Sequence, residues 1–412
     1  MQTSWVTTTI GEQATLQRGI DITQKQQTAG TVPVISSGGI SSFHNVAAVS
    51  GPGVVLGRKG TVGTVFYVAS DFWPHDTTLW VKDFHGNDRR FVYYFFRSIT
   101  RNLSALDVGT ANPTLNRNHV HPLQVEWPTL TEQRTIVEIL GALDDKIELN
   151  RRMNRTLEST ARAIFRSWFV DFDPVVAKAA GRLPFGTSAD LATLFPDRFQ
   201  EAEFGPLPDS WRIGTLRDCC IRVENGGTPR RDRPEFWLPA EVPWLTSAEV
   251  RQVIVTKTQN HISNNGLMSS SAKLWPGGTT VVALYGATAG QVCWLATEMC
   301  ANQACCGLIP RGGWSSYVYL HVLSSVDALA DQSRGSAQQN LSQEIVARFQ
   351  TTLPSGPVVA EFEKMVRPII GREQLNHEQS RTLAALRDTL LPKLMSGELR
   401  VRDAEKLVGS HV

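Results

Sequence analysis

The stretch GTANPTLNRNHV, residues 109–120, decides the fold, because a close variant of it, GSAQQNLSQEIV, returns at residues 335–346. The two copies are 226 positions apart, and this register continues without a gap, so that Leu115 meets Leu341. An internal repeat on this scale indicates two copies of one structural plan in a single chain. We therefore predict two related globular domains.

The beginning of each copy also repeats, although more loosely. SWVTTTIGE at residues 4–12 resembles SWRIGTLRD at residues 210–218, with an offset of 206 positions. Between the copies, a stretch rich in Pro, Gly and small residues shows no sustained period and predicts a long connector. The predicted segments are residues 1–128 (first globular domain), 129–170 (first spacer helix), 171–205 (connector), 206–355 (second globular domain), 356–396 (second spacer helix) and 397–412 (C-terminal tail).

Each copy ends in a long helical run. In residues 131–170 and 358–395, apolar residues recur every three or four positions, which predicts two amphipathic helices that pair antiparallel along one seam. Asn150 and Asn376 occupy matching seam positions, where a polar residue commonly sets the register. The alternative is that each helix packs on its own domain and the Asn match is accidental. The predicted pairing residues are Leu143, Ile147, Asn150, Leu157, Ile164, Trp168, Ile369, Asn376, Leu383, Leu390 and Leu394.

Both globular domains start with strand signals and end with helical ones. Short runs rich in β-branched residues, such as VPVISSGGI (residues 32–40) and GTTVVALYGATAGQVCWL (residues 278–295), predict strands and hairpins. Later runs, such as RRFVYYFFRS (residues 89–98), predict short amphipathic helices. We predict the α/β class, with two mixed α/β domains separated by the two long antiparallel helices.

Composition limits the class of protein. The chain has 412 residues, 42% of them hydrophobic, and a formal charge of +2 from 41 basic and 39 acidic residues. This length is sufficient for more than one buried core. The balanced charge indicates neither a strongly basic nucleic-acid binder nor an acidic tail, but it allows local patches. We find no signal-peptide pattern and no apolar run near the roughly 20 residues of a membrane helix, so we expect a soluble, cytoplasmic protein.

The cysteines and histidines give little sign of a metal site. All six cysteines lie between Cys219 and Cys306 without a CxxC spacing, which favours free, mostly buried thiols over a zinc site. His119 and His121 share one face if extended, but no further ligand cluster accompanies them. We therefore predict no bound metal.

Catalytic signatures are also missing. GRKGTVG at residues 57–63 is the nearest approach to a phosphate loop and has the wrong spacing, and no GxGxxG, HExxH or GxSxG motif is present. Asp144, Asp145 and Lys146 have a spacing seen in nucleases, but their place in a charged helical run favours a solvated face. We expect a binding or scaffolding protein rather than an enzyme.

The segment TEQRTIVEILGALDDKIELNRRMNRTLESTARAIFRSWFVDFDPV, residues 131–175, and the later LRDTLLPKLMSGELRV, residues 386–401, resemble the specificity subunits of type I restriction-modification systems. The pattern GT/GS-A…L before a proline and a long helix is also similar, and the two-copy plan extends the resemblance over essentially the whole chain. The helix with WFVDFDPV is its most specific part, whereas the globular domains resemble the family much less closely.

The resemblance implies a non-catalytic DNA-recognition subunit. Each globular domain would be a target recognition domain that reads one half of a split DNA sequence, and the helices would set the spacing between the halves. The helices would also dock two modification subunits, which methylate adenine with S-adenosylmethionine, and restriction subunits driven by ATP would join them. This chain itself would hold no cofactor. Since the two domains differ in sequence, the two half-sites should differ as well.

Several polar and basic residues are candidates for DNA contact. Asn and Gln can pair with the edge of adenine, and Ser, Thr and basic residues can bind phosphate. The alternative for the repeated segment is that it only caps and orients the following helix, and the alternative for the arginine cluster of the second domain is a solvated loop. The candidates are Arg58, Lys59, Thr110, Asn112, Asn116, Arg230, Arg231, Arg233, Ser336, Gln338, Gln339 and Asn340.

Other functions remain open at this point. A specificity chain of a stand-alone methyltransferase, or of a combined cutting-and-modifying enzyme of type IIB kind, would share these features. A two-headed protein-interaction scaffold without a DNA role is a more distant alternative, and a cryptic enzyme is more distant still.

Overall fold

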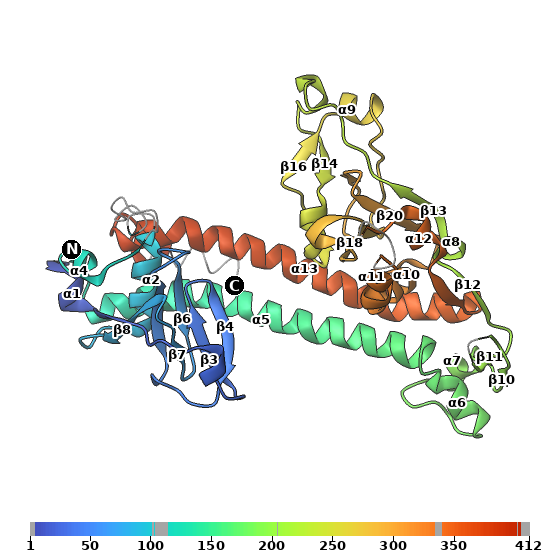
Figure 1. The fold of residues 1–412 in the computed structure, drawn as a ribbon, viewed down its shortest axis with the longest axis horizontal. Helices are drawn as coiled ribbons and strands as arrows, with labels where there is room; N and C mark the ends of the chain where they lie inside the picture. Colours follow the sequence, from blue (N-terminus) through green and yellow to red (C-terminus); the bar gives the residue numbers. More distant parts are fainter. Residues whose placement is uncertain are drawn as a thin grey trace. The chain divides into compact units, whose positions relative to one another are not determined.

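The computed structural model describes residues 5–100, 103, 114–203, 205–333, 340–401 and 403–404. It divides into unit 1, which comprises Met1–Leu149 and Ser380–Val412, and unit 2, which comprises Asn150–Gln379. Each unit contains one globular domain and a part of both long helices, α5 (Leu130–Phe169) and α13 (Gly356–Met395) (Figure 1). The prediction of two mixed α/β domains accompanied by two long helices is confirmed.

The domain of unit 1 contains two main sheets. Its elements are β1 (Val6–Thr9), α1 (Ile10–Gln13), β2 (Thr15–Arg18), η1 (Gln24–Gln26), β3 (Val32–Ser36), β4 (Gly39–His44), β5 (Gly53–Gly57), β6 (Val65–Val68), β7 (Trp73–Pro74), β8 (Thr78–Asp83), α2 (Arg89–Ser98), α4 (Arg117–Val120) and β9 (Gln124–Trp127). The strands of one sheet lie in the order β2-β8-β5-β6, all antiparallel, and those of the other in the order β4-β3-β7. A separate antiparallel pair joins β1 to β9.

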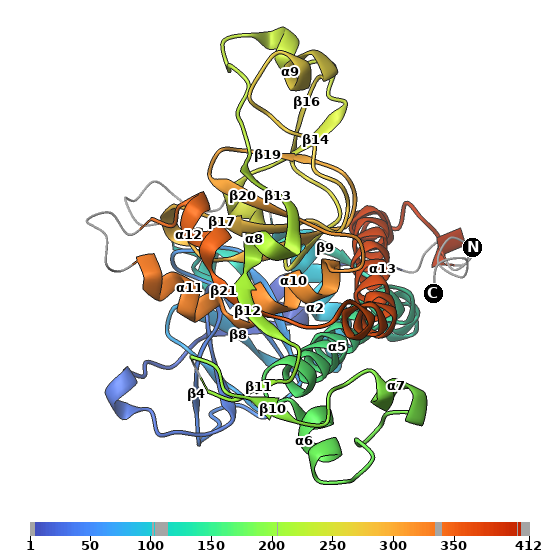
Figure 2. The same ribbon diagram turned by 90° about the vertical axis from the view of Figure 1, so that its right-hand side faces the viewer.

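The domain of unit 2 has the corresponding elements and carries the connector. They are α6 (Asp173–Ala179), α7 (Ala189–Thr193), β10 (Phe199–Gln200), β11 (Leu207–Pro208), β12 (Arg212–Thr215), α8 (Leu216–Cys219), β13 (Cys220–Asn225), η2 (Pro234–Phe236), β14 (Val242–Leu245), η3 (Ser247–Arg251), β15 (Ile254–Val255), β16 (Asn260–Ile262), α9 (Asn264–Met268), β17 (Thr280–Ala283), η4 (Gly286–Thr288), β18 (Val292–Leu295), β19 (Cys300–Ala301), β20 (Cys305–Pro310), α10 (Ser315–Ser324), α11 (Val326–Ser333), α12 (Gln343–Arg348) and β21 (Gln350–Leu353). Its sheets have the orders β13-β20-β17-β18-β15 and β16-β14-β19, and α10 packs against β17, β18 and β20 (Figure 2).

The internal repeat is present in the strand pairing itself. In unit 1 the first strand pairs Val6 with Trp127, and in unit 2 Arg212 pairs with Leu353, which preserves the offsets of 206 and 226 positions. The order β2-β8-β5-β6 recurs as β13-β20-β17-β18, and the parallel pairing of β3 with β7 recurs in β14 with β19. The prediction of a repeated structural plan is confirmed.

Helix α2 illustrates how local sequence builds the core of unit 1. Asp88 begins the helix by accepting hydrogen bonds from the backbone amides of Arg90 and Phe91, which satisfies two amide donors that a helix start leaves without partners. The aromatic face of α2 is buried, and Phe91 and Phe95 both pack edge-on against the Trp127 ring of β9. Large aromatic side chains of this kind supply much of the burial in a small core.

In unit 1 the two long helices pair through an apolar seam. Leu143, Ile147, Leu383, Leu390 and Leu394 are all buried in the core that also holds α2. Their shared burial agrees with the predicted seam, but the same residues also pack on the domain, so both interpretations of the periodicity apply in this unit.

The acidic pair at the start of that seam is structural. Asp144 is 19% exposed, accepts a hydrogen bond of 2.8 Å from the Tyr94 hydroxyl and forms a 2.5 Å ion pair with Arg387 of α13. Asp145 pairs with Arg90 of α2 at 2.6 Å. The expectation that these residues lie on a solvated helix face is therefore wrong for Asp144. Because its partners come from two other helices, Asp144 ties α5 to both of them.

In unit 2 the same two helices pair through a polar layer. The side-chain amide of Asn376 donates to the Asn154 oxygen over 2.7 Å, and the Asn150 amide donates to Gln379 over 2.9 Å. Asn150, Asn154 and Asn376 are all buried. Asn150 contacts Gln379, and Asn154, further along α5, contacts Asn376, which comes earlier in α13. The two helices therefore run in opposite directions, and the predicted antiparallel pairing is confirmed. The side-chain partner of Asn376 is Asn154, one helical turn beyond the predicted match.

Other pairing candidates of unit 2 belong to its domain core. Trp168 is buried there, and Ile164 and Ile369 pack against the same cluster, whereas Leu157 is half-buried. The connector joins this core through Val175, Phe195 and other apolar residues. The long connector therefore forms part of unit 2.

Two further findings concern the chain as described. The six cysteines have free thiols, and burial raises the pKa of Cys219, Cys300 and Cys306 to about 12, so these thiols stay protonated. Within the described ranges, none of the helices has the length and apolar character needed to cross a membrane.

Candidate nucleic-acid interface

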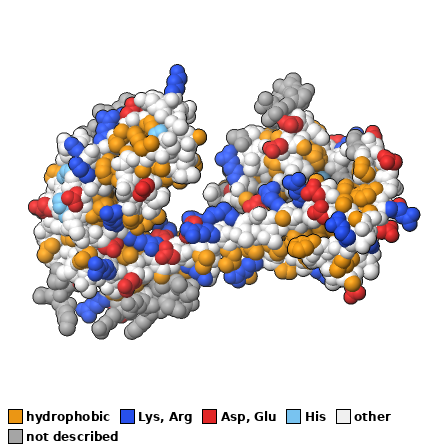
Figure 3. Space-filling model, turned by 90° about the horizontal axis from the view of Figure 1, so that it is seen from below, with side chains coloured by type: hydrophobic (Ala, Val, Ile, Leu, Met, Phe, Trp, Pro, Cys, Tyr) orange, Lys and Arg blue, Asp and Glu red, His pale blue; other side chains and the backbone are white. Residues whose placement is uncertain are grey.

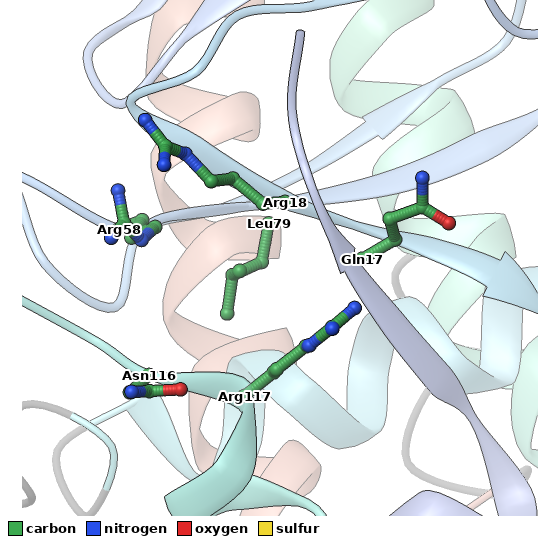
Figure 4. Close-up of a pocket in the computed structure, with 6 residues that line it drawn as sticks. All are labelled: Gln17, Arg18, Arg58, Leu79, Asn116 and Arg117. Carbon is green, nitrogen blue, oxygen red and sulfur yellow. The ribbon is translucent and has the colours of Figure 1, made fainter.

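Unit 1 contains an open cleft lined mainly by polar and basic side chains. Its volume is about 520 Å³. The side chains of Arg18, Arg58 and Arg117 come from three different elements and surround Leu79 in Figure 4. The lining residues are Gln17, Arg18, Arg58, Leu79, Asn116 and Arg117. Two predicted DNA-binding residues, Arg58 and Asn116, therefore share one site.

The backbone of Arg58 is held from both sides. Its amide donates to the Thr77 carbonyl over 2.8 Å, and its carbonyl accepts from the Leu115 amide over 2.9 Å. Lys59, which is exposed, forms an antiparallel bridge with Thr114. The middle of the repeated segment therefore lies against the Gly-rich loop after β5, and this contact fixes the backbone of Arg58 beside the cleft.

The Gly-rich loop requires glycine at two points. A side chain at Gly57 would place its Cβ 2.2 Å from the Thr61 carbonyl oxygen. Gly60 has a φ of +77°, a conformation that L-residues with side chains rarely adopt. The tight turn that results presents Arg58 and Lys59 next to each other.

One acidic residue balances only part of the cleft's charge. Asp76 binds the Arg18 guanidinium at 2.9 Å and lies 3.2 Å from the His75 imidazole. Burial lowers the pKa of the Arg58 guanidinium, and the nearby Arg18 lowers it further, while Asp76 opposes the change. Arg58 stays protonated, because arginine does not lose its proton in proteins. Three arginines beside one carboxylate form an electropositive site suited to phosphate or to the acceptor edge of guanine.

The structure supports the capping interpretation for one member of the repeated segment. The Asn116 side chain accepts from the Asn118 amide over 3.0 Å and so begins α4. His121, at the end of that helix, accepts from the Leu16 amide through Nε2, and burial lowers the pKa of this imidazole. A ring nitrogen that accepts in this way is neutral and serves the fold. His119 is exposed.

A group of possible metal ligands lies beside the cleft. Among the described residues, ligand atoms of Asp21, His75 and Asp76 lie within 4.8 Å of one another. This group was not anticipated from the sequence, since its members come from a loop and from the turn before β8. Asp76 is already bound to Arg18, so the arrangement is an ion-pair network as it stands.

The sequence did not indicate four of the cleft residues, which are Gln17, Arg18, Leu79 and Arg117. Gln17 and Arg18 end the edge strand β2, and Arg117 follows Asn116 at the start of α4. Arg117 could have been noticed because it lies within the repeated segment, directly after Asn116. For Arg18 the sequence offered only a basic residue before a glycine. Their convergence depends on the pairing of β2 with β8, in which Arg18 faces Leu79.

Unit 2 has the same backbone at this point but different side chains. The Leu341 amide donates to the Leu284 carbonyl over 3.0 Å, as Leu115 does to Arg58 in unit 1. Leu284 is fully buried in the domain core, and Tyr285, which follows it, is 37% exposed. Ser342 caps α12 where Asn116 caps α4, and the half-buried Asn340 lies just before it. A core leucine therefore stands where unit 1 has Arg58.

The arginine cluster predicted in unit 2 lies elsewhere, in the loop after β13. Arg230, Arg231 and Arg233, predicted as DNA contacts with a solvated loop as the alternative, are exposed there. Asp232 binds Arg230 at 2.6 Å and Glu235 lies 3.4 Å from Arg233, so part of the positive charge is balanced locally. On the face drawn in Figure 3, basic side chains lie scattered among acidic and apolar ones. Five further candidates, Thr110, Asn112, Ser336, Gln338 and Gln339, lie outside the described residues.

Comparisons with known proteins agree on one family. A profile described as "Type I restriction modification DNA specificity domain" matches residues 2–159 and 208–357. The chain is 30% identical over 330 residues to the Type I restriction enzyme HindI specificity subunit of Haemophilus influenzae, covering 70% of this chain and 71% of that protein. It is 22% identical over 373 residues to the Type I restriction enzyme MjaIX specificity subunit of Methanocaldococcus jannaschii, covering 85% and 78%.

A solved structure has the same fold. The S subunit of a type I restriction-modification system from M. genitalium aligns with a TM-score of 0.63 and 15% identity, covering 95% of this chain and 96% of that one. At this level of identity the likeness concerns the fold alone.

Proposed function

This chain belongs to the family of type I restriction-modification specificity subunits, which recognise DNA targets, and we propose that its two domains each read one half of a split, asymmetric DNA sequence. One observation carries the proposal: a single scaffold occurs twice in the chain, with Arg58 at one point of the first copy and Leu284 at the same point of the second. Two copies of one scaffold with different side chains at the same point fit two different half-sites. Two linked half-site readers also gain affinity, because binding of the first raises the effective concentration of the second.

In unit 1, the arginine cleft is the proposed DNA contact. Arg58 and Arg117 supply planar guanidinium groups at one open hollow, beside Arg18, whose guanidinium is paired with Asp76. Guanidinium groups bind phosphate or the O6 and N7 acceptors of guanine with two parallel hydrogen bonds. Lys59 extends the basic surface at the loop tip. The near-neutral charge of the whole chain fits this role if partner subunits supply further phosphate contacts.

The chain is proposed to act as a non-catalytic part of a larger complex. Its long helices would dock modification subunits, two of them by the symmetry of the repeat, and restriction subunits would join these. S-adenosylmethionine and ATP would be held by those partners, with no cofactor or metal on this chain. We place the complex in the cytoplasm, with double-stranded DNA as its target. The stand-alone methyltransferase and the type IIB-like enzyme differ from this proposal in the partner genes rather than in this chain.

Methylome sequencing tests the proposal directly. Cells that express this chain with its neighbouring modification gene are compared with cells that lack this chain. We expect a split motif with two different halves, methylated only when the chain is present. Absence of any motif, although both proteins are made and associate, would contradict DNA recognition and favour the protein scaffold. Methylation without the modification gene would contradict the non-catalytic role.

Two variants test whether the domain of unit 1 reads one half of the motif. Arg58→Ala removes a cleft guanidinium and is expected to relax or lose one half of the motif while the other half persists. Lys82→Ala removes a positive charge from the exposed end of β8, the strand that lines the cleft at Leu79. The control should leave the motif unchanged. If both variants alter the motif alike, the effect reflects overall charge and the cleft is not the reader.

A further inference from the structure

The basic loop of unit 2 follows β13. This strand corresponds to β2 of unit 1, which carries the cleft residues Gln17 and Arg18. At its start, the Gly227 amide donates to the Ala301 carbonyl over 2.9 Å, next to the turn that precedes β20. In unit 1 the equivalent turn, before β8, holds Asp76 and Thr77, which contact Arg18 and Arg58. Unit 2 therefore carries these three arginines on the connection from β13 to β14, which corresponds to the connection from β2 to β3 in unit 1.

Two of the three arginines in this loop already have carboxylate partners. Arg230 forms two hydrogen bonds with Asp232, from Nε over 3.1 Å and from Nη2 over 2.6 Å, and these occupy one fork of its guanidinium. Arg233 donates to Glu235 over 3.4 Å. A nucleic acid would have to displace these carboxylates before it could use either guanidinium, and the remaining acids would repel its phosphates.

Arg231 differs from both neighbours. Its guanidinium carbon lies 5.1 Å from the centre of the Trp237 ring and 5.8 Å from that of Trp244, and within the described residues it has no carboxylate partner. A guanidinium held over an aromatic face gains cation–π attraction. This contact does not use up the N–H donors of the group, which remain available to a planar acceptor.

The aromatic platform under Arg231 is itself fixed. Trp244 is 1% exposed, and its indole N–H donates to the Gly227 carbonyl over 3.0 Å. Trp237 packs edge-on against it at 5.2 Å and donates to the Arg230 carbonyl over 3.1 Å. Both indoles thus anchor the loop that carries the arginines. A side chain held on such a platform loses little conformational freedom when it binds.

We propose that Arg231 is the residue through which unit 2 binds its DNA half-site, by donating two hydrogen bonds to one pair of acceptors, and that Arg230 and Arg233 shape the loop without binding DNA. The acceptors are either N7 and O6 of a guanine or two oxygens of one phosphate, since both match the guanidinium fork. The inference rests on the proposed function and adds to it the contact residue of the second half-site.

The test measures binding of the purified complex with its modification subunits to a duplex that carries the methylated motif. Arg231→Ala is expected to weaken binding roughly 10- to 100-fold, the range for a good bidentate contact. Arg230→Ala and Arg233→Ala remove the same charge from the same loop and should change binding less than about threefold, the scale of an exposed charge with a local partner. Thermal unfolding of each variant checks that the fold is kept.

Arg231→Lys separates the two acceptor sources, because it keeps the charge and loses the fork. If the acceptor is a guanine, Arg231→Lys binds as weakly as Arg231→Ala, and replacing one guanine in one half-site weakens the wild type but not the variant. If it is a phosphate, Arg231→Lys retains most of the affinity, and Arg231→Ala lowers the salt dependence of binding by about one counterion for every sequence.

Two results would overturn the inference while the wild-type complex still binds its motif. One is unchanged affinity of Arg231→Ala, and the other is an equal loss for Arg230→Ala or Arg233→Ala. Failure of the proposed function is distinguishable, because in that case the wild-type complex would show no preference for any sequence before a variant is compared.

Discussion

The domains of unit 1 and unit 2 share a backbone plan and differ in where they carry positive charge. In unit 1 the cations converge on the sheet itself, with Arg58 fixed by the Gly-rich loop. In unit 2 the same loop position holds the buried Leu284, and a cluster of three exposed arginines lies on the loop after β13. Strand pairing and helix caps are therefore the repeated features, whereas the side chains presented at the surface are free to differ. This separation allows one fold to read unlike targets.

The two stretches of the long helix pair show a second contrast. Unit 1 joins its helices through leucines and the Asp144–Arg387 ion pair, whereas unit 2 joins them through Asn150, Asn154 and Asn376. Apolar packing tolerates a shifted register better than a set of buried amides does, since each displaced amide would lose its partner. The polar layer of unit 2 is therefore suited to hold the register.

The largest expected effect contrasts the two residues at the shared loop position. Leu284→Ala should destabilise unit 2 by about 2–5 kcal/mol, because it removes a fully buried side chain from the core. Arg58→Ala should alter stability by less than about 1 kcal/mol, since Arg58 is half-buried at an open cleft. Denaturant-dependent hydrogen exchange assigns each loss to its unit. Equal destabilisation by both variants would mean that Arg58 is a core residue like its counterpart.

The next effect concerns the buried carboxyl group of Glu373, next to the polar layer of unit 2. Glu373 is 5% exposed, and burial, reinforced by the Glu158 carboxylate and opposed by Arg162, raises its pKa to about 7. The pKa of Glu373 is higher in the folded chain than in the unfolded one, so ionisation of this carboxyl opposes folding. Unit 2 should therefore lose stability as pH rises from about 4.5 to 7. Glu373→Gln should remove this loss and stabilise unit 2 by about 3 kcal/mol at pH 8, with no gain at pH 4.

Urea unfolding at both pH values measures this difference. The side chain of His377 also faces Glu373, at 4.0 Å, and burial lowers the pKa of that imidazole, so it adds little positive charge above neutral pH. Glu361→Gln, on the same helix in an exposed ion pair, is the control. A gain that is the same at pH 4 and pH 8 would show that the carboxylate of Glu373 is not the cause.

A smaller effect tests the polar layer against the leucine seam of unit 1. Asn376→Leu leaves the Asn154 oxygen buried without its 2.7 Å donor and should cost about 1–3 kcal/mol. The double variant with Asn154→Leu should recover part of that loss, because no unpaired amide remains between the two positions. The coupling energy from the four proteins is the measurement, and a strictly additive result would show that the two amides do not interact.

The smallest effect should be the same in both units. Asn116→Ala and Ser342→Ala remove the caps of α4 and α12, and each should cost about 1 kcal/mol. Local hydrogen exchange in the two short helices reports the change. If only one cap matters, the repeated segment serves the fold in one unit and has another use in the other.

Much of this architecture was predictable because its signals are local. The period of three and four in residues 131–170 predicts a long helix without any knowledge of its partner, and the glycines at positions 57 and 60 predict a tight turn. Arg58 and Asn116 were identified for the same reason, since each lies in a short motif with a recognisable shape. The resemblance of the helical segments to the specificity subunits supplied the family, and the family matches agree with it.

The sequence by itself therefore determined the repeat, the long helices and the family. Tertiary structure alone decided which side chains meet. Arg18 and Arg117 line the same cleft as Arg58, and the Asn376 amide pairs with Asn154. Arg231 packs over a tryptophan ring, whereas its neighbours pair with carboxylates. The physical reason is that helices and turns arise from interactions between residues close in the chain. Which charged side chains come together depends instead on strand pairing and on the other partners available nearby. A short stretch of sequence contains neither kind of information.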